Sequence, residues 1–183
     1  MPDIVSVVGG GSLGYELDLP SIYQDIESEV KQYEPESYPA LVLKFNEDGA
    51  TVMLFSSGKY NIAGASSIRE LHQTHRRVVN TITQMLGVDI DADSECELRN
   101  LVYRDDFGTN LKLEALVLLL GVENVEYEPE QFPALDYRPP EMSGLFKIFR
   151  TGKVTLTGVT DPDEAEEAFN NLFEELQTAI NST

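Results

Sequence analysis

The chain contains the same sequence twice, at an offset of about 94 residues. The segment Tyr33–Leu41 (YEPESYPAL) returns as Tyr127–Leu135 (YEPEQFPAL). Residues 4–86 align with residues 98–180 without a gap, and about 18 of the roughly 83 pairs are identical, well above the number expected for unrelated sequences. The chain therefore consists of two similar halves, each of about 85 residues.

Halves of this size bury little apolar surface alone, so two that share one continuous sheet are more stable than two separate domains. We predict a first repeat at residues 1–88, a linker at 89–96 and a second repeat at 97–183. Composition is that of a folded protein, with 42% hydrophobic and 25% charged residues. No apolar run reaches the roughly 20 residues of a membrane span, and the N-terminus has no signal-like segment, so we expect a cytoplasmic protein.

The formal net charge of −19 admits two interpretations. Acidic residues could exclude nucleic acid, because proteins that bind a polyanion are normally basic. Alternatively, they could form a solvated coat suited to a high-salt cytoplasm, where the Debye length is about 3 Å at 1 M salt. The distribution favours the second interpretation, since the acidic residues crowd expected helices and loops. Five basic residues lie in or beside expected strands: Lys44, Lys59, Arg138, Lys147 and Lys153.

Each half is predicted to run strand, helix, three strands, helix. The expected strands are 4–8, 41–46, 51–55 and 59–63, then 98–103, 135–138, 145–149 and 153–157. The first helix should span 18–30 with Asp18 as N-cap, and its apolar counterpart 113–120 should be deeply covered. Gly9-Gly10-Gly11 lacks the spacing of a phosphate-binding loop and is expected to be a flexible turn.

A long helix with one apolar stripe is predicted to close each half. The stripes are Ile68, Leu71, His75, Val78, Ile82 and Met85, then Ala165, Phe169, Leu172, Leu176 and Ile180. Strand alternation puts Val52 and Leu54 under these helices, and leaves the opposite side of the same strand with Thr51, Met53 and Phe55. Because the four helices are needed on one side, the other side is uncovered and partly apolar, which is typical of a binding surface.

No enzyme site is evident in the sequence. We find no nucleophile paired with a base, no paired carboxylates in an apolar setting and no phosphate loop. His72 and His75 are three residues apart, but His75 is on the core stripe and no third ligand is evident. Cys96, the only cysteine, can form no internal disulfide. We expect no cofactor and no metal.

At this point the sequence resembles the TATA-box-binding protein family, over nearly the whole chain. The motifs that carry the resemblance are Leu13-Gly14, Glu16–Leu19, Phe55–Lys59, Val125–Leu135, Tyr137-Arg138, Gly152-Lys153 and Leu156–Gly158. With the acidic composition, it indicates a divergent archaeal member from a halophile. The resemblance implies an α+β fold: a pseudo-twofold saddle with one curved antiparallel sheet, helices on the convex face and the concave face on the DNA minor groove.

The resemblance also assigns DNA-binding residues. Its two aromatic wedge pairs are Tyr38 with Phe55 and Phe132 with Phe149, although each ring taken singly could be a core residue. The other positions implied are Val8 and Val102 in the groove, Asn100 on base acceptors, Lys44, Lys59, Arg138 and Lys153 on phosphates, and Thr157. For a lone basic residue, a merely solvated side chain is an equal alternative.

Five positions depart from the family pattern. Ser6 replaces a second asparagine, Tyr38 replaces a phenylalanine, Asn61 and Thr155 are unusually polar, and Lys147 stands where an apolar residue is expected. Lys147 could reach a phosphate. These changes indicate an altered or relaxed sequence preference.

The resemblance implies a second surface, on the loop with Glu128, Glu130 and Gln131. It would contact transcription factor B and through it RNA polymerase. The first-half copy, with Glu34 and Glu36, is expected to be an ordinary acidic loop. The free protein could also pair with a second copy through its uncovered face.

Three functions follow from these observations. The leading one is a general transcription initiation factor that binds and bends A·T-rich promoter DNA. The second is a divergent paralogue that acts as a protein-interaction module with weak or altered DNA binding. The third, an accessory domain of an enzyme, fits poorly with the complete double repeat.

Overall fold

A computed structural model describes residues 2–91 and 95–181, with side chains up to residue 178. The chain divides into two compact units. The N-terminal unit is Val5–Arg99, and the C-terminal unit is Met1–Ile4 with Asn100–Thr183. The predicted repeat limits stay a prediction, and residues 92–94 of the predicted linker 89–96 lie outside the described residues.

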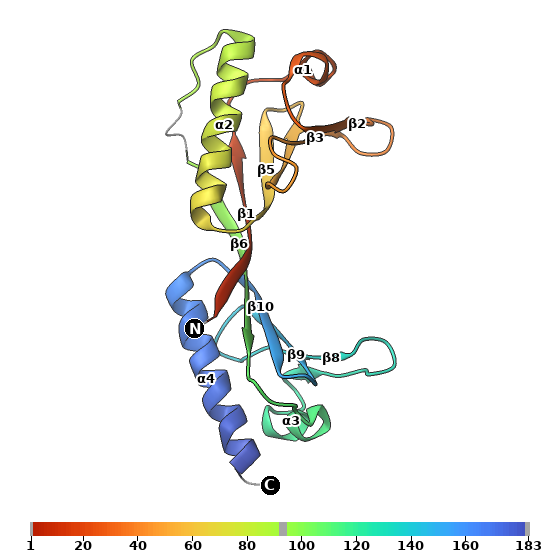
Figure 1. Cartoon of the computed structure of the whole chain (residues 1–183), viewed down its shortest axis with the longest axis vertical. Coiled ribbons are helices and arrows are strands. Elements are labelled where there is room, and N and C mark those ends of the chain that lie inside the picture. The colour runs from red at the N-terminus through yellow and green to blue at the C-terminus, as the bar shows by residue number, and fades with distance from the viewer. Residues whose placement is uncertain (1, 92–94, 182–183) are drawn as a thin grey trace. The chain divides into compact units, whose positions relative to one another are not determined.

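The N-terminal unit is an antiparallel sheet with two helices (Figure 1). Its sheet order is β2-β3-β4-β5-β1, and helix α2 packs on β5. The elements are β1 (Asp3–Ser12), α1 (Leu19–Asp25), β2 (Val30–Tyr33), β3 (Ala40–Lys44), β4 (Thr51–Phe55), β5 (Lys59–Ala65) and α2 (Ile68–Leu86).

The C-terminal unit repeats this arrangement, with the sheet order β6-β10-β9-β8-β7. Its elements are β6 (Glu97–Asp106), α3 (Leu113–Leu119), β7 (Val125–Glu126), β8 (Ala134–Tyr137), β9 (Leu145–Phe149), β10 (Lys153–Val159) and α4 (Pro162–Asn181). The first three residues of β6, 97–99, belong to the N-terminal unit. Two tandem α+β repeats with antiparallel strands agree with the predicted fold class.

Most predicted strands are confirmed, but one strand in each unit was missed. The strands at 51–55 and 145–149 have the predicted limits. The missed strands are β2 and β7, which lie at sheet edges. The residues of β2 alternate between exposed and half-buried, so no buried apolar side chain signals a strand there.

Helix α1 is shorter than the predicted 18–30. It ends before Ile26, whose extended backbone leads the chain into β2. Residues from Val30 onward pair with β3, so sheet hydrogen bonds take the place of further helical turns. Asp18 stands at the N-cap position, but its carboxylate accepts from the Ser21 hydroxyl at 2.6 Å and from no backbone N–H.

The prediction that 113–120 is deeply covered was wrong. Only Leu113 and Leu116 of α3 are buried, whereas Leu118 is 78% exposed. A surface helix of two turns can bury only one face, and α3 turns one face toward α4, the element with which it has most contacts. Its apolar outer face is therefore at the surface.

The prediction of a flexible turn at Gly9–Gly11 was also wrong, because these residues lie inside β1. At each of the three glycines, another atom of the protein occupies the space that a Cβ atom would need. A Cβ on Gly9 would lie 2.8 Å from the Glu97 carbonyl oxygen, and one on Gly10 would collide with the Tyr60 carbonyl oxygen. The glycines are needed for close approach of backbones.

The two long helices are present, and the predicted stripe of α2 is buried except at its ends, where Ile68 and Met85 are half-buried. The side chain of Ser67 accepts from the Glu70 N–H at 3.1 Å, and Gly87 closes α2 in the left-handed conformation. In α4 the Asp161 carboxylate accepts from the Asp163 N–H at 2.9 Å. The buried stripes are Leu71, His75, Val78 and Ile82, and Ala165, Phe169, Leu172 and Leu176. Ile180 is beyond the described side chains.

Candidate nucleic-acid interface

Each unit has one sheet face that the core does not bury. Successive residues of β4 and β9 alternate between half-exposed and fully buried. We call the half-exposed side of each sheet its open face. In the N-terminal unit it carries Val42, Thr51, Met53, Phe55, Asn61 and Ala63, and in the C-terminal unit Asp136, Leu145, Lys147, Phe149, Thr155 and Thr157.

Both open faces carry a pair of aromatic rings at the same place. The ring centroids of Tyr38 and Phe55 are 6.3 Å apart with an interplanar angle of 66°. Those of Phe132 and Phe149 are also 6.3 Å apart, at 64°. Tyr38 is 44% exposed and Phe132 46% exposed, while Phe55 and Phe149 are half-buried. None of the four rings is sealed in the core, so all of them are available to a ligand.

Hydrogen bonds orient Asn100 on the C-terminal unit. Its side-chain oxygen accepts from the Gly158 N–H at 2.8 Å, and its amide nitrogen donates to the Thr157 hydroxyl at 3.2 Å. These bonds fix which end of the amide is the donor, on the face with half-buried Val102. Ser6, at the equivalent position, is too short to repeat them. Val8 is half-buried like Val102.

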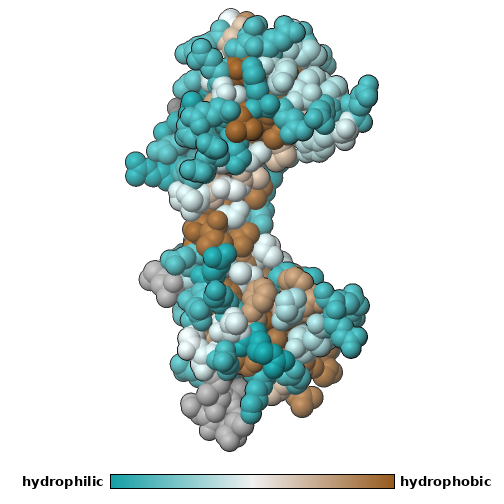
Figure 2. Space-filling model, turned by 45° about the vertical axis from the view of Figure 1, so that its right-hand side comes forward, coloured by the Kyte–Doolittle hydropathy of each residue, from teal (hydrophilic) through white to brown (hydrophobic). Residues whose placement is uncertain are grey.

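Three of the four predicted phosphate-binding residues are exposed. Lys59, Arg138 and Lys153 are exposed, and Lys44 is half-buried with its Nζ 3.3 Å from the Glu47 carbonyl oxygen. The face of the molecule seen in Figure 2 is predominantly hydrophilic with separate apolar patches, as expected of a chain with a net charge of −19.

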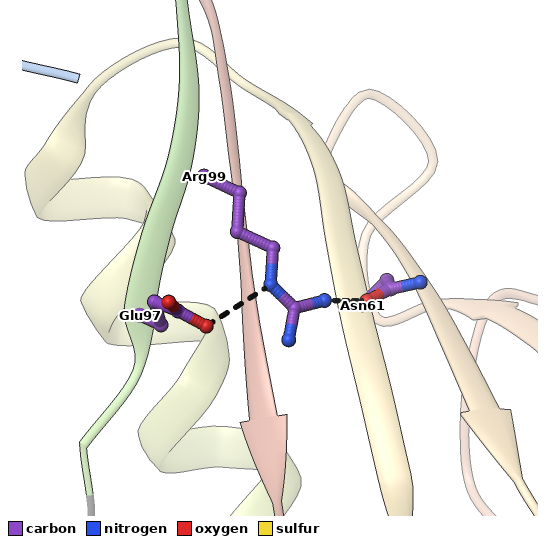
Figure 3. A network of polar contacts seen from close by, with 3 residues as sticks. All are labelled: Asn61, Glu97 and Arg99. Atoms are coloured by element: carbon purple, nitrogen blue, oxygen red, sulfur yellow. Dashed lines mark hydrogen bonds and ion pairs between the residues drawn. The ribbon is translucent and has the colours of Figure 1, made fainter.

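Arg99 is a candidate residue that sequence reasoning missed. Its guanidinium donates to the Asn61 side-chain oxygen and forms an ion pair with Glu97 at 3.4 Å (Figure 3). It passes over Gly10, where a Cβ would lie 3.0 Å from both the guanidinium and the Asn61 oxygen. The glycine therefore lets a cation from β6 reach the open face. Gly10 was the available sequence signal, but it was interpreted as part of a turn.

Asp136 was also missed, and it changes the environment of Lys147. The Lys147 Nζ lies 2.7 and 2.8 Å from the two carboxylate oxygens of Asp136, and 4.9 Å from the Phe132 ring centroid. The two residues are directly paired between β8 and β9. The pairing register of β8 and β9 would have predicted this ion pair, because Asp136 and Lys147 are on the same side of the sheet as Phe149.

The predicted partner loop is a compact turn with exposed side chains. The Glu128 carbonyl oxygen accepts from the N–H groups of Gln131 at 2.9 Å and Phe132 at 3.0 Å. The Gln131 amide also donates to the Glu128 carboxylate, and Glu130 is exposed. The first-half copy has the same backbone turn, in which Glu34 accepts from Ser37 and Tyr38. The backbone hydrogen bonds therefore do not distinguish the two loops.

The buried polar groups of the N-terminal unit are structural. The Tyr60 hydroxyl is 2.7 Å from His75 Nδ1. Burial raises the pKa of Tyr60 and of the Cys96 thiol, so both are protonated at neutral pH. In the part of the chain that the structure describes, no three His, Cys, Asp or Glu side chains gather as a metal site would require. The same part has no helix with the length and apolarity of a membrane span.

Comparison with known proteins places this geometry in a family. The family model described as "Transcription factor TFIID (or TATA-binding protein, TBP)" matches residues 1–85 and 95–179. The chain belongs to the TATA-binding protein family. It is 38% identical to the TATA-box-binding protein of Natronomonas pharaonis over 96% of this chain and 92% of the relative. It is 33% identical to TATA-box-binding protein C of Halobacterium salinarum, over 97% and 98% of the two chains.

A solved structure shows the same fold. The Methanococcus jannaschii TBP superposes with a TM-score of 0.83 at 31% identity, covering 97% of this chain and 98% of that one. The predicted TATA-binding protein fold with two tandem repeats is therefore confirmed. Several relatives come from halophilic archaea, which agrees with the interpretation of the acidic residues as a coat suited to high salt.

Proposed function

We propose that this protein is a general transcription initiation factor that binds the minor groove of A·T-rich promoter DNA, bends it and recruits transcription factor B, and RNA polymerase through it. The family membership supports the general role. A factor of this kind acts on the chromosome, so we expect it in the cytoplasm with the nucleoid.

The observation that carries the DNA-binding part is the repeated aromatic pair. Two pairs with the same separation and almost the same angle lie on half-exposed faces, and a group of exposed apolar side chains is typical of a binding surface. Aromatic and apolar side chains that enter the minor groove unstack base steps and kink the duplex. Val8, Val102, Asn100 and Thr157 are proposed to line the groove, and Lys44, Lys59, Arg138 and Lys153 to lie near phosphates.

A salt titration tests this proposal. Binding of a fluorescent A·T-rich duplex is measured by anisotropy from low salt to about 1 M KCl, where surface repulsion is screened. We expect binding that persists or strengthens with salt. Phe132→Ala with Phe149→Ala should weaken it by about 100-fold, because each stacked ring contributes about 1–3 kcal/mol.

Leu118→Ala serves as the control, since Leu118 is highly exposed on α3, away from the open faces. It should bind DNA like the unchanged protein. Equal affinity of the aromatic double variant and this control would refute the proposed role of the rings.

The partner surface is a separate part of the proposal. Glu128, Glu130 and Gln131 are all exposed on one turn and could meet a basic surface of transcription factor B. Glu128→Lys with Glu130→Lys should abolish the ternary complex in a gel-shift experiment while leaving DNA binding intact. Glu34→Lys with Glu36→Lys is the matched control, because it makes the same charge change in the equivalent turn.

The second candidate function is a protein-interaction module with weak or altered DNA binding. Asp136 favours it, because its carboxylate neutralises Lys147 and so removes one positive charge that could attract phosphates. No binding to the A·T-rich duplex at any salt, with transcription factor B still bound, would establish this alternative.

A dimer of the free protein, formed through the open faces, would appear in sedimentation and should be lost on adding DNA.

A further inference from the structure

We infer that Asp136 and Lys147 read a G·C base pair in the minor groove, so that one half of the binding site accepts or prefers G·C. This inference rests on the proposed DNA-binding function. It assigns a specificity-determining role to two residues of the C-terminal open face.

The position of the pair supports this role. Asp136, Lys147 and Thr155 form one row across β8, β9 and β10, in the register Asp136 to Lys147 to Thr155. The carboxylate and the ammonium side chains are 24% and 33% exposed, so both can be reached from outside without leaving the sheet. Lys147 lies over the ring of Phe132, which places the pair beside a proposed wedge.

The chemistry of the pair matches G·C better than A·T. In the minor groove an A·T pair shows only the acceptors adenine N3 and thymine O2, whereas a G·C pair adds the guanine N2 amino donor. A carboxylate can only accept, so opposite A·T it would face other acceptors. Opposite G·C, Asp136 accepts from the guanine amino group, and Lys147 donates to a neighbouring acceptor.

Desolvation sharpens the discrimination. When the face is covered, a carboxylate that meets no donor costs much more than one that exchanges water for a hydrogen bond. The ion pair with Lys147 at 2.7 Å limits this cost opposite A·T but leaves the remaining lone pairs of Asp136 unused. A G·C pair satisfies them.

The N-terminal unit lacks this device. The equivalent row is Val42, Met53 and Asn61, and the Met53 sulfur lies 3.6 Å from the Tyr38 hydroxyl. Neither Val42 nor Met53 can accept a hydrogen bond from a guanine amino group as a carboxylate can. The two half-sites should therefore respond differently to the same base change, and the protein should sit on DNA in one orientation.

The experiment measures the affinity of the full chain at about 1 M KCl for an A·T-rich duplex and for variants with one G·C pair at each position in turn. Three proteins are compared: the unchanged chain, Asp136→Val with Lys147→Met, and Val42→Asp with Met53→Lys. The second gives the C-terminal unit the residues of the N-terminal one, and the third does the reverse. Thermal unfolding confirms that each is folded.

We expect the unchanged protein to bind at least one G·C duplex as tightly as the A·T duplex, with the tolerant positions in one half-site. Asp136→Val with Lys147→Met should lose about tenfold on that duplex and little on the A·T one. Val42→Asp with Met53→Lys should extend tolerance to the other half-site.

Two outcomes overturn the inference differently. Equal G·C penalties in both half-sites, or unchanged profiles in both variants, refute it while leaving the proposed function intact. No binding to any duplex, including those with G·C, refutes the proposed function as well.

Discussion

The two units differ at several pairs of equivalent positions on their open faces, and three of these pairs include a residue proposed to contact bases in the C-terminal unit. These three pairs are Ser6 and Asn100, Val42 and Asp136, and Met53 and Lys147. The aromatic pairs, in contrast, keep the same ring separation in both units. The geometry of the aromatic pairs is therefore the same in both units, while neighbouring side chains on the open faces differ. A repeated fold can thus preserve how DNA is deformed and still vary how its bases are read.

The cores of the two units also differ at equivalent positions. The N-terminal core contains the hydrogen-bonded pair Tyr60 and His75, and the equivalent C-terminal residues are Val154 and Phe169. Phe169 packs edge-on against Phe146, with ring centroids 5.2 Å apart. At these equivalent core positions the N-terminal unit therefore has a hydrogen-bonded polar pair, and the C-terminal unit has apolar contacts.

The largest expected effect is on the apolar core. Phe169→Ala removes a ring that is 1% exposed, and it should lower the free energy of unfolding by about 3–5 kcal/mol. Denaturant unfolding followed by circular dichroism measures the change. A loss below about 1 kcal/mol would show that α4 contributes little to stability.

The polar core should show coupling. His75→Phe should cost about 1–3 kcal/mol, because it breaks a buried hydrogen bond of 2.7 Å. Tyr60→Val should cost about 3–5 kcal/mol, because it breaks the same bond and also removes a ring that is 1% exposed. The double variant has the residues of the C-terminal unit and should cost less than the sum of the two singles. Additive losses in this double-mutant cycle would contradict the equivalence of the two core sites.

A smaller effect is expected from the central amide. Asn100→Ser removes the donor next to Thr157 and should weaken binding of the A·T-rich duplex by about tenfold, a typical value for one base contact. Ser6→Asn should strengthen it, because the N-terminal unit would gain the same donor. Anisotropy titrations at fixed salt measure both, and an unaffected Asn100→Ser would argue against a base contact there.

The smallest effect concerns pH. Hydrogen bonds from Ser66 hold the pKa of the Glu70 carboxyl below its usual value. Since the folded pKa is lowered, the stabilisation is present above the unfolded value of about 4.3 and is lost as the pH falls through the folded value. Glu70→Gln should cost about 1 kcal/mol at neutral pH, as for other helix caps.

The difference between Glu70→Gln and the unchanged protein should shrink as the pH is lowered below about 4. Urea midpoints at neutral and acid pH test this. A constant difference would mean that the ionised carboxylate is not the stabilising group.

Sequence reasoning predicted the elements whose side chains alternate or repeat strongly. The strand at 51–55 and the helical stripe through Leu71 and Val78 follow from periodicity, because burial repeats with the backbone. The edge strand β2 and the exposed face of α3 were not predictable in this way. Whether an apolar helix is covered depends on which element packs on it, and that is a tertiary property.

The candidate site was predicted in its repeated parts and missed where the units differ. The aromatic pairs came from the repeat and from strand parity. Asp136 and Arg99 were missed because their partners, Lys147 and Asn61, lie on other strands. Only the register brings them together.

Gly10 has a consequence for how the two copies can diverge. Arg99 reaches Asn61 only because position 10 has no side chain, whereas in the other unit Arg104 itself occupies the equivalent position, opposite Thr155. Each unit has an arginine beside this point of the sheet. In the C-terminal unit Arg104 stands at the position equivalent to Gly10, whereas in the N-terminal unit Arg99 comes from β6, the strand next to that of Gly10. A side chain at position 10 would also collide with the Tyr60 carbonyl oxygen, whatever residue stands at position 99. The N-terminal copy can therefore hold a cation at this point only from the neighbouring strand, and a chimaera that replaces Arg99 alone would lose that positive charge.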